Sequence, residues 1–172
     1  SVVGLFVNAD AEDVAHVAER VQLTLLQFHG DQTPQQCTEI ARRCRLPFMR
    51  AARVRPGLDL VEFADQYRDA SGLLLDAFVE GYGGGGHVFD WTLIPAQWLP
   101  PNPANPRAND APRIVLSGGL NAQNVAGAIE RVRPYAVDVS SGVEASKGVK
   151  DHARIAAFVR AVRQADAGRS AG

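Results

Sequence analysis

The chain has 172 residues, 46% apolar and 22% charged, and its 18 Lys and Arg nearly balance its 19 Asp and Glu, giving a formal net charge of −1. This is the composition of a globular protein, and the length allows one sizeable core, so we expect a single domain over residues 1–172. Lys and Arg are scattered, which argues against nucleic-acid binding. The apolar runs are far shorter than the ~20 residues of a membrane-spanning helix, and the first residues lack the basic lead and cleavage site of a signal peptide.

The two cysteines indicate a reducing compartment. Cys37 and Cys44 lie on one predicted helix, where two turns separate them by about 10 Å, beyond the reach of a disulfide. No pair of Cys or His residues has the spacing of metal ligands. We therefore expect a cytoplasmic protein without a metal.

Short apolar runs typical of strands alternate with amphipathic stretches typical of helices. The first helical stretch has Val14, Ala18 and Val21 at helical spacing, and Asp10 precedes it as a candidate cap. The predicted strands begin at Val2, Leu25, Met49, Gly72, Ile114 and Ala136, and the predicted helices span Ala11–Val21, Pro34–Cys44, Leu58–Tyr67, Ala122–Arg131 and Lys150–Ala165.

The strand starts are 22 to 24 residues apart except for one interval of 42, between Gly72 and Ile114. Such regular spacing favours right-handed βαβ units in a parallel sheet. The long interval contains the glycine tract Gly81–Gly86, which could form a lid or a plain flexible loop. It also contains a short helical stretch from Asp90 and the proline-rich segment Pro100–Pro106, which we interpret as a surface excursion.

Six strands fit either an open doubly wound sheet or part of a (β/α)₈ barrel. Candidate site residues follow strand after strand, as in a barrel, whereas an open sheet gathers them at one switch point. No GxGxxG, GxxxxGK[ST] or GxSxG motif occurs, which argues against the nucleotide-binding and hydrolase alternatives. A complete barrel takes ~200–250 residues. We therefore predict an α/β chain that forms the C-terminal three-quarters of a (β/α)₈ TIM barrel and lacks roughly the first two βα units.

Glycine-rich loops follow the last two predicted strands. Gly118 and Gly119 lie between a strand and a helix, and Ser140, Ser141 and Gly142 follow the next strand. Glycines let the backbone approach a ligand, and the N–H groups that open a helix bind anions. Because the last two loops of a barrel commonly bind phosphate, we predict a phosphate site here. The alternative is that these glycines serve only the turns.

Single polar side chains occur at the ends of other predicted strands. Asp76 could act as a general acid or cap the next loop. Gln27 and His29, two residues apart, share a strand face, and His29 could donate to a substrate oxygen or to a neighbouring group of the protein. Arg53 could bind a carboxylate or phosphate or form a salt bridge at the rim. Asp138 could orient a ligand or a neighbouring side chain.

Several segments, in the same order along the chain, resemble the phosphoribosylanthranilate isomerase family of tryptophan biosynthesis. The resemblance extends from Ser1 to about Val162. The segments are Ser1–Asn8 (SVVGLFVN), Leu25–Gly30 (LLQFHG), Leu73–Ala77 (LLLDA) followed by Gly81–Gly86 and Phe89–Trp91, Leu116–Leu120 (LSGGL) and Val137–Glu144 (VDVSSGVE).

The resemblance implies an Amadori rearrangement that converts N-(5-phosphoribosyl)anthranilate to 1-(2-carboxyphenylamino)-1-deoxyribulose 5-phosphate without a cofactor. By motif, Asp76 corresponds to the general acid that protonates the ribose ring oxygen. The remaining correspondences assign the Gly118–Gly119 and Ser140–Gly142 loops to the phosphate and Gln27, His29 and Asp138 to the substrate pocket.

Two family motifs are absent from this chain. The family's general base is a cysteine in a Lys-Ile-Cys-Gly motif on its first strand, and an arginine after its second strand binds the anthranilate carboxylate. Where the family often has Gly-Gly-Thr-Gly, this chain has Gly83–Gly86. Because the cysteine base is absent, we expect the chain alone to be inactive. Because the first two βα units are absent, we expect it to associate with itself through exposed strand edges.

Two alternative functions remain open. One is another phosphate-binding barrel enzyme, of the sugar-phosphate epimerase or thiamine-phosphate synthase type, although an epimerase should have metal-binding side chains at successive strand ends and His29 stands alone. The other is an inactive fragment that binds phosphate.

Overall fold

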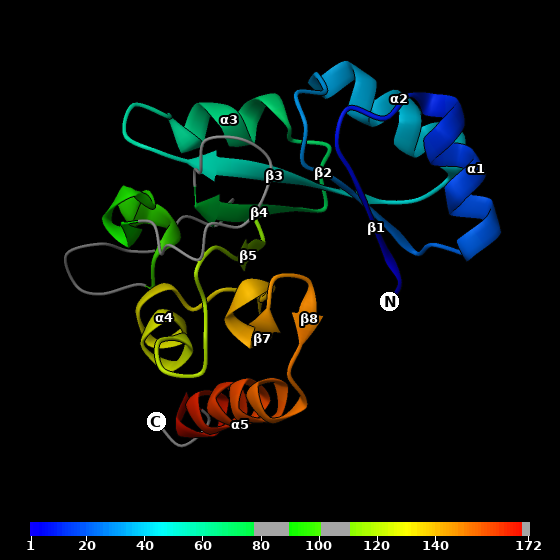
Figure 1. Ribbon diagram of the computed structural model, residues 1–172. Coiled ribbons are helices and arrows are strands. Elements are labelled where there is room, and N and C mark those ends of the chain that lie inside the picture. Colours follow the sequence, from blue (N-terminus) through cyan, green and yellow to red (C-terminus); the bar gives the residue numbers. More distant parts are fainter. Residues whose placement is uncertain (78–89, 101–110, 170–172) are drawn as a thin grey trace. The chain divides into compact units, whose positions relative to one another are not determined.

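Strands and helices alternate along the chain in the computed structural model, which describes residues 1–77, 90–100 and 111–169 (Figure 1). The strands are β1 (Val3–Phe6), β2 (Leu25–Phe28), β3 (Phe48–Val54), β4 (Gly72–Ala77), β5 (Ile114–Leu116), β6 (Ala136–Val137), β7 (Glu144–Ser146) and β8 (Val149–Lys150). The helices are α1 (Ala11–Val21), α2 (Pro34–Cys44), α3 (Leu60–Gln66), α4 (Val125–Val132) and α5 (His152–Arg169), with short 3₁₀ turns at Trp91–Leu93, Ala96–Trp98 and Ser141–Val143.

The six predicted strands are confirmed as one sheet with the order β1-β2-β3-β4-β5-β6. Pairing is parallel between β1 and β2, between β2 and β3, and between β5 and β6. The register places Gln27 opposite Leu5 on one side and Met49 on the other. Within the described part of the chain, β1 and β6 are therefore the edge strands of this sheet.

Side-chain caps explain why the first helices begin where they do. Asp10 accepts hydrogen bonds from the N–H groups of Glu12 and Asp13, which confirms the predicted cap of α1. Thr33 and Gln36 form a capping box at α2, and Pro34 occupies its first turn. Both helices have the predicted bounds.

The C-terminal helix differs from its prediction. Lys150 belongs to β8, which pairs antiparallel with β7 in a small hairpin, and α5 begins only at His152. Gly148, with φ +79°, makes the turn of this hairpin. The Asp151 side chain accepts a hydrogen bond from the Arg154 N–H at the start of α5. The predicted helix start at Lys150 was therefore wrong by two residues.

The chain divides into two compact units. The first comprises Ser1–Ala52 and Asp59–Leu74, and the second comprises Arg53–Leu58 and Leu75–Gly172. The single domain expected from the length stays a prediction. The glycine tract Gly81–Gly86 and residues 101–106 of the proline-rich segment lie outside the described residues, whereas Asp90 caps a 3₁₀ turn.

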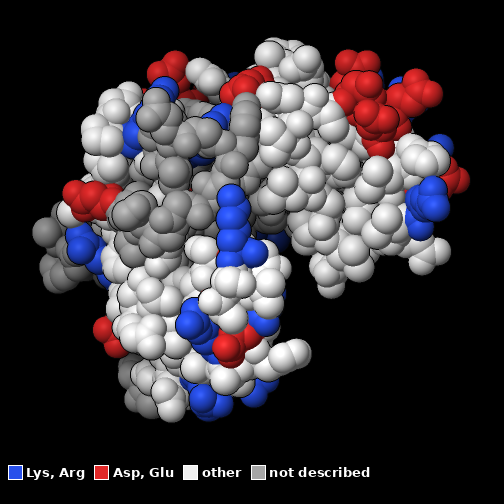
Figure 2. All heavy atoms as spheres, viewed as in Figure 1, with Lys and Arg blue, Asp and Glu red and all other residues white. Residues whose placement is uncertain are grey.

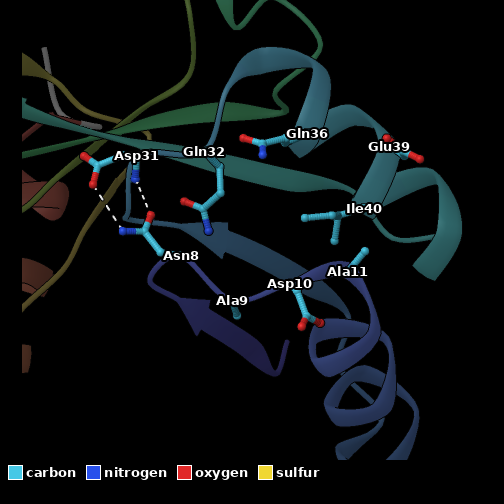
Figure 3. Close-up of a pocket in the computed structure, with 9 residues that line it drawn as sticks. All are labelled: Asn8, Ala9, Asp10, Ala11, Asp31, Gln32, Gln36, Glu39 and Ile40. Atoms are coloured by element: carbon cyan, nitrogen blue, oxygen red, sulfur yellow. Dashed lines mark hydrogen bonds between the residues drawn. The ribbon is translucent and has the colours of Figure 1, made fainter.

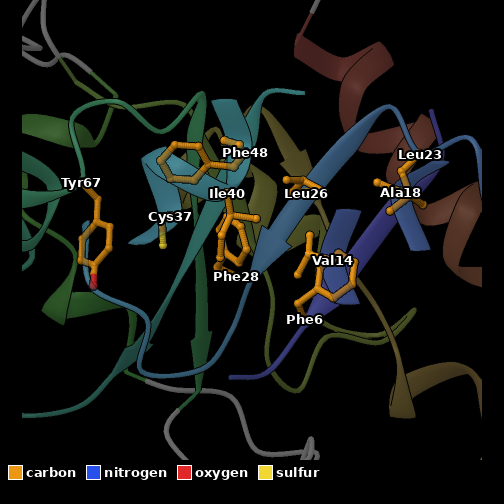
Figure 4. Packing of buried hydrophobic residues seen from close by; sticks show 11 residues of the cluster. Phe6, Val14, Ala18, Leu23, Leu26, Phe28, Cys37, Ile40, Phe48 and Tyr67 are labelled. Atoms are coloured by element: carbon orange, nitrogen blue, oxygen red, sulfur yellow. The ribbon is translucent and has the colours of Figure 1, made fainter. Parts of the chain in front are cut away.

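The first unit has one apolar core between its strands and helices (Figure 4). The rings of Phe28 on β2 and Phe48 on β3 lie 5.7 Å apart. Val14 of α1 and Cys37 of α2 are fully buried beside them. The helix-facing side of β2 is therefore apolar, which leaves Gln27 on the opposite side of that strand.

In the second unit, α4 buries Val125, Ala128, Ile129 and Val132 and contacts α5.

On the face shown in Figure 2, Lys and Arg lie in separate groups with Asp and Glu between them, and no continuous basic surface is visible. None of the described helices combines the length and apolar composition needed to cross a membrane.

Candidate active site

The second unit contains Asp76 near the end of β4. Its carboxylate accepts a hydrogen bond from the Ala77 N–H at 2.9 Å, and the side chain is half-buried. The three residues before it on the strand are buried leucines. Asp76 therefore lies at the boundary between an apolar strand and the following loop, where a carboxyl group can reach a ligand.

Gly118 follows β5 and lies directly against Asp76. A methyl group built on Gly118 would lie 2.5 Å from the Ala77 nitrogen and 2.8 Å from the Asp76 Oδ1, and Gly118 also has φ +80°. Only glycine fits this contact without displacing the carboxylate. Gly119 has φ +66°. Within the described chain, the N–H groups of Gly118 and Gly119 donate no hydrogen bond to the protein.

The loop after β5 is rigidified by two asparagines. Asn124 Oδ1 accepts from the Asn121 N–H at 2.8 Å, and Asn124 Nδ2 donates to the Gly119 carbonyl at 3.0 Å. Asn121 Oδ1 accepts from the N–H groups of Gln123 and Asn124. These bonds close the loop before α4, so the glycine backbone is held in one conformation.

The loop after β6 packs against the loop after β5. A methyl group on Gly142 would lie 1.9 Å from the Leu120 carbonyl oxygen and 3.2 Å from the Asn121 Cα. Ser141 and Gly142 form a short 3₁₀ turn, and Ser140 before it is exposed. The two predicted phosphate loops are therefore neighbours, and the first of them touches Asp76.

Ser117 and Asp138 link the two strands that carry these loops. The Ser117 Oγ donates to the Asp138 Oδ2 at 2.9 Å, and the Asp138 N–H donates to the Leu116 carbonyl at 2.8 Å. Ser117 is buried, whereas Asp138 is exposed. The bond holds the Asp138 carboxylate over β5.

Lys150 on the β7–β8 hairpin anchors the loop after β6. Its Nζ donates to the Ser140 carbonyl at 3.0 Å, to the Ser140 Oγ at 3.2 Å and to the Glu144 carboxylate at 2.8 Å. The hydrogen bond from Lys150 to the Glu144 carboxylate, with another from the Gly148 N–H, holds the pKa of Glu144 below its usual value. From sequence, Lys150 was predicted only as the first residue of the C-terminal helix, because the short hairpin strands contain no apolar run.

Gln27 and His29 lie in the first unit, at the end of β2. Gln27 is buried, and His29 is half-buried and donates its N–H to the Phe6 carbonyl at 2.9 Å. Arg53 is half-buried on β3, one residue before the strand ends, and belongs to the second unit. The role of Arg53 at the substrate stays a prediction.

The first unit also contains a hollow of about 460 Å³ between the loops after β1 and β2 (Figure 3). Asn8 and Asp31 join the two loops by hydrogen bonds of 2.6 and 3.1 Å. The carboxylates of Asp10, Asp31 and Glu39 line the hollow without any Lys, Arg or His. An acidic lining repels phosphate, so this hollow does not fit a phosphorylated ligand.

The family model for N-(5'-phosphoribosyl)anthranilate (PRA) isomerase matches residues 1–161. The chain belongs to the N-(5'-phosphoribosyl)anthranilate isomerase family. The N-(5'-phosphoribosyl)anthranilate isomerase of Ralstonia pickettii (strain 12J) is 72% identical over 167 residues, which are 97% of this chain and 72% of that relative. That of Ralstonia nicotianae is 74% identical over 167 residues, or 97% of this chain and 71% of the relative.

Solved structures of the family have the same fold. The isomerase of Thermotoga maritima matches with a TM-score of 0.79 and 40% identity over 94% of this chain and 72% of its own. A phosphoribosyl anthranilate isomerase in complex with reduced 1-(o-carboxyphenylamino)-1-deoxyribulose 5-phosphate matches with a TM-score of 0.74 and 38% identity over 94% of this chain and 71% of its own. The predicted family and the α/β fold with a six-stranded sheet are thereby confirmed.

Proposed function

We propose that this chain provides the phosphate-binding and acid-bearing part of an N-(5-phosphoribosyl)anthranilate isomerase, within a (β/α)₈ barrel. The observation that supports this most directly is the contiguity of three strand ends in the second unit. Gly118 touches Asp76, and Gly142 touches Leu120 of the same loop. A sugar phosphate could therefore extend from one loop pair to one carboxyl group.

The phosphate is bound by the loops at Gly118–Gly119 and Ser140–Gly142. The N–H groups of Gly118 and Gly119, which donate to no other group among the described residues, can donate to phosphate oxygens. Lys150 supports phosphate binding indirectly, because it holds Ser140 in place and brings a positive charge to the loop.

Asp76 is the general acid. Its carboxyl group gives a proton to the ribose ring oxygen as the bond between that oxygen and C1 breaks, which opens the furanose to a protonated Schiff base. A general base then removes the C2 proton, and the C1–C2 enol that results rearranges to the aminoketose. Gln27, His29 and Asp138 contact the substrate, and Arg53 pairs with one of its anionic groups. No cofactor or metal takes part.

The general base is supplied by residues outside these 172. Cys37 and Cys44 are both on α2, and burial raises the pKa of the Cys37 thiol to about 11 and that of Cys44 above its usual value. Neither is a thiolate at neutral pH. The relatives are longer than this chain, and Leu5 on the edge strand β1 is 56% exposed. Both observations support two further βα units that would pack on β1 and carry the base.

Turnover with and without an added segment tests this proposal. The 172-residue chain is purified alone and together with the part of the Ralstonia pickettii relative that lies outside the matched region, and consumption of N-(5-phosphoribosyl)anthranilate is measured. We expect no turnover by the chain alone and isomerisation by the pair. Steady turnover by a pure monomer of the chain would overturn the assignment of the base to another segment.

An inactive phosphate-binding fragment is the second candidate, because both described cysteines are unsuited to act as the base. This second candidate predicts that the chain binds phosphate but that no isomerisation occurs when the added segment is present. A metal-dependent epimerase gains no support, since among residues 1–77, 90–100 and 111–169 no group of three His, Cys, Asp or Glu is arranged to hold a metal. For the compartment, the two free cysteines support the cytoplasm.

A further inference from the structure

Arg50 on β3 is a buried arginine that contacts the end of β2. It lies opposite Phe28 in the sheet register, and 6% of its surface is exposed. Its Nη1 donates to the Phe28 carbonyl and its Nη2 to the Gly30 carbonyl, each at 2.8 Å. These two carbonyls belong to the residues before and after His29, so one guanidinium bridges the chain on both sides of that residue.

The charge of Arg50 is balanced by carbonyls and rings. Its guanidinium carbon lies 4.8 Å from the centre of the Tyr67 ring and 5.7 Å from that of Phe63. No carboxylate forms an ion pair with it in the described part of the chain. A buried cation without an ion-pair partner is costly to fold. Charge pairing therefore does not explain why an arginine lies at this position. Its hydrogen bonds to the end of β2 offer a different explanation.

The segment that follows His29 is held from the same side. The Tyr67 hydroxyl, whose ring faces Arg50, donates to the Gln32 carbonyl at 2.7 Å. The His29 N–H, in turn, donates to the Phe6 carbonyl at 2.9 Å. Residues 28–32 are thus fixed by β1 on one side and by Arg50 and Tyr67 on the other.

We propose that Arg50 is a positioning residue that fixes His29 at the end of β2 for contact with the substrate. The value of this position to catalysis rests on the substrate-contacting role proposed above for His29. Arginine is required because its planar fork presents two N–H groups to two carbonyl oxygens at once. A lysine keeps the charge but its single ammonium cannot bridge both carbonyls in the same geometry.

The test compares Arg50→Lys with Phe48→Leu. Phe48 lies on the same face of β3, is buried, and packs its ring on that of Phe28. Its side chain has no donor for either carbonyl, so its replacement loosens the core but spares the bridge. Amide hydrogen exchange of the intact 172-residue chain is measured by NMR. We expect Arg50→Lys to accelerate exchange of the His29 N–H at least tenfold relative to Leu26, and Phe48→Leu to change the two alike. Equal acceleration in both variants would overturn the positioning role.

Binding of reduced 1-(o-carboxyphenylamino)-1-deoxyribulose 5-phosphate by calorimetry gives the functional readout. We expect Arg50→Lys to weaken binding about as much as His29→Ala, the double variant to be no weaker than either, and Phe48→Leu to bind like the parent chain. Normal affinity of Arg50→Lys beside a weakened His29→Ala would contradict the proposal while leaving the proposed function intact. If the parent chain itself fails to bind, the proposed function fails, and the exchange rates alone decide the role of Arg50.

Discussion

Asp76 is the side chain on which turnover should depend most. Asp76→Asn keeps the shape and can still accept the Ala77 hydrogen bond, but an amide delivers no proton to the ring oxygen. We expect turnover of the chain paired with its added segment to fall roughly 10²-fold or more. The circular dichroism spectrum should be unchanged.

The control for this prediction is Asp65→Asn, since Asp65 lies on α3 in an exposed pair with Arg68 at 3.6 Å. That variant should keep full turnover. Near-normal turnover of folded Asp76→Asn would reject the role of Asp76 as the acid.

The two arginines of β3 show what sequence could not decide. Both Arg50 and Arg53 occur in the segment Phe48–Val54, and their alternation puts them on opposite faces. We predicted a role for Arg53 because it is closer to the strand end. The importance of Arg50 depends on the register with β2, which brings two carbonyls to its guanidinium, and register is not a local property of the sequence.

At the scale of a loop, Gly118 connects the phosphate-binding segment to the acid. Gly118→Ala must adopt φ +80° or rearrange, at a cost of about 1–2 kcal/mol, and its methyl group collides with Asp76 and Ala77. We expect a lower melting temperature and at least tenfold weaker phosphate binding by calorimetry.

The matched variant is Gly127→Ala, on α4, where an added methyl group meets nothing within 4 Å. It should stabilise the chain by about 0.5–1 kcal/mol and bind phosphate normally. Parallel losses in both variants would show that the effect of Gly118→Ala is not specific to the loop.

The β7–β8 hairpin should make the loop after β6 sensitive to acid. Because Lys150 and Gly148 bond to its carboxylate, the pKa of Glu144 is lower in the folded chain than in the unfolded chain. The stabilisation from the Glu144 contacts is therefore complete above pH ~4.3, the pKa of the carboxyl group in the unfolded chain. It is lost as the pH falls through the lower pKa of the folded chain. Glu144→Gln should melt below the parent chain at pH 7, and this difference should disappear in strong acid.

Glu130→Gln, on the exposed side of α4, is the control for the loss of a carboxylate and should melt like the parent chain at pH 7. A difference between Glu144→Gln and the parent chain that persists unchanged to low pH would contradict a stabilising contact between Lys150 and the Glu144 carboxylate.

The elements that sequence predicted well are those with local signals. The bounds of α1 and α2 were right because Asp10 and Thr33 cap them and their apolar residues recur at helical spacing. The hairpin was missed because β7 and β8 lack the apolar run that marks the six predicted strands. The adjacency of Gly142 and Leu120 likewise comes from packing between distant loops, although the loops themselves were predicted from their glycines.

At the scale of the whole molecule, the edge strand β1 should promote self-association. Val3 and Leu5 on β1 and Val7 just after it are exposed, with 42%, 56% and 39% of their surfaces accessible. We expect sedimentation velocity at tens of micromolar to detect dimers or larger species, and Leu5→Lys to shift the chain towards monomer. Ile155→Lys on α5, which replaces a residue of 38% exposure in the second unit, should leave association unchanged. Association insensitive to Leu5→Lys would place the contact elsewhere.

NMR mapping of reduced 1-(o-carboxyphenylamino)-1-deoxyribulose 5-phosphate on the ¹⁵N-labelled chain tests the central claim most directly. That claim is that Asp76 and the loops after β5 and β6 form one site for a sugar phosphate. It predicts saturable shifts of the amides of Gly118, Gly119, Ser141 and Gly142 together with Ala77, and competition by inorganic phosphate at the loop amides but not at Ala77. Saturable binding that leaves these amides unmoved and shifts those around Asp10 and Asp31 instead would contradict it.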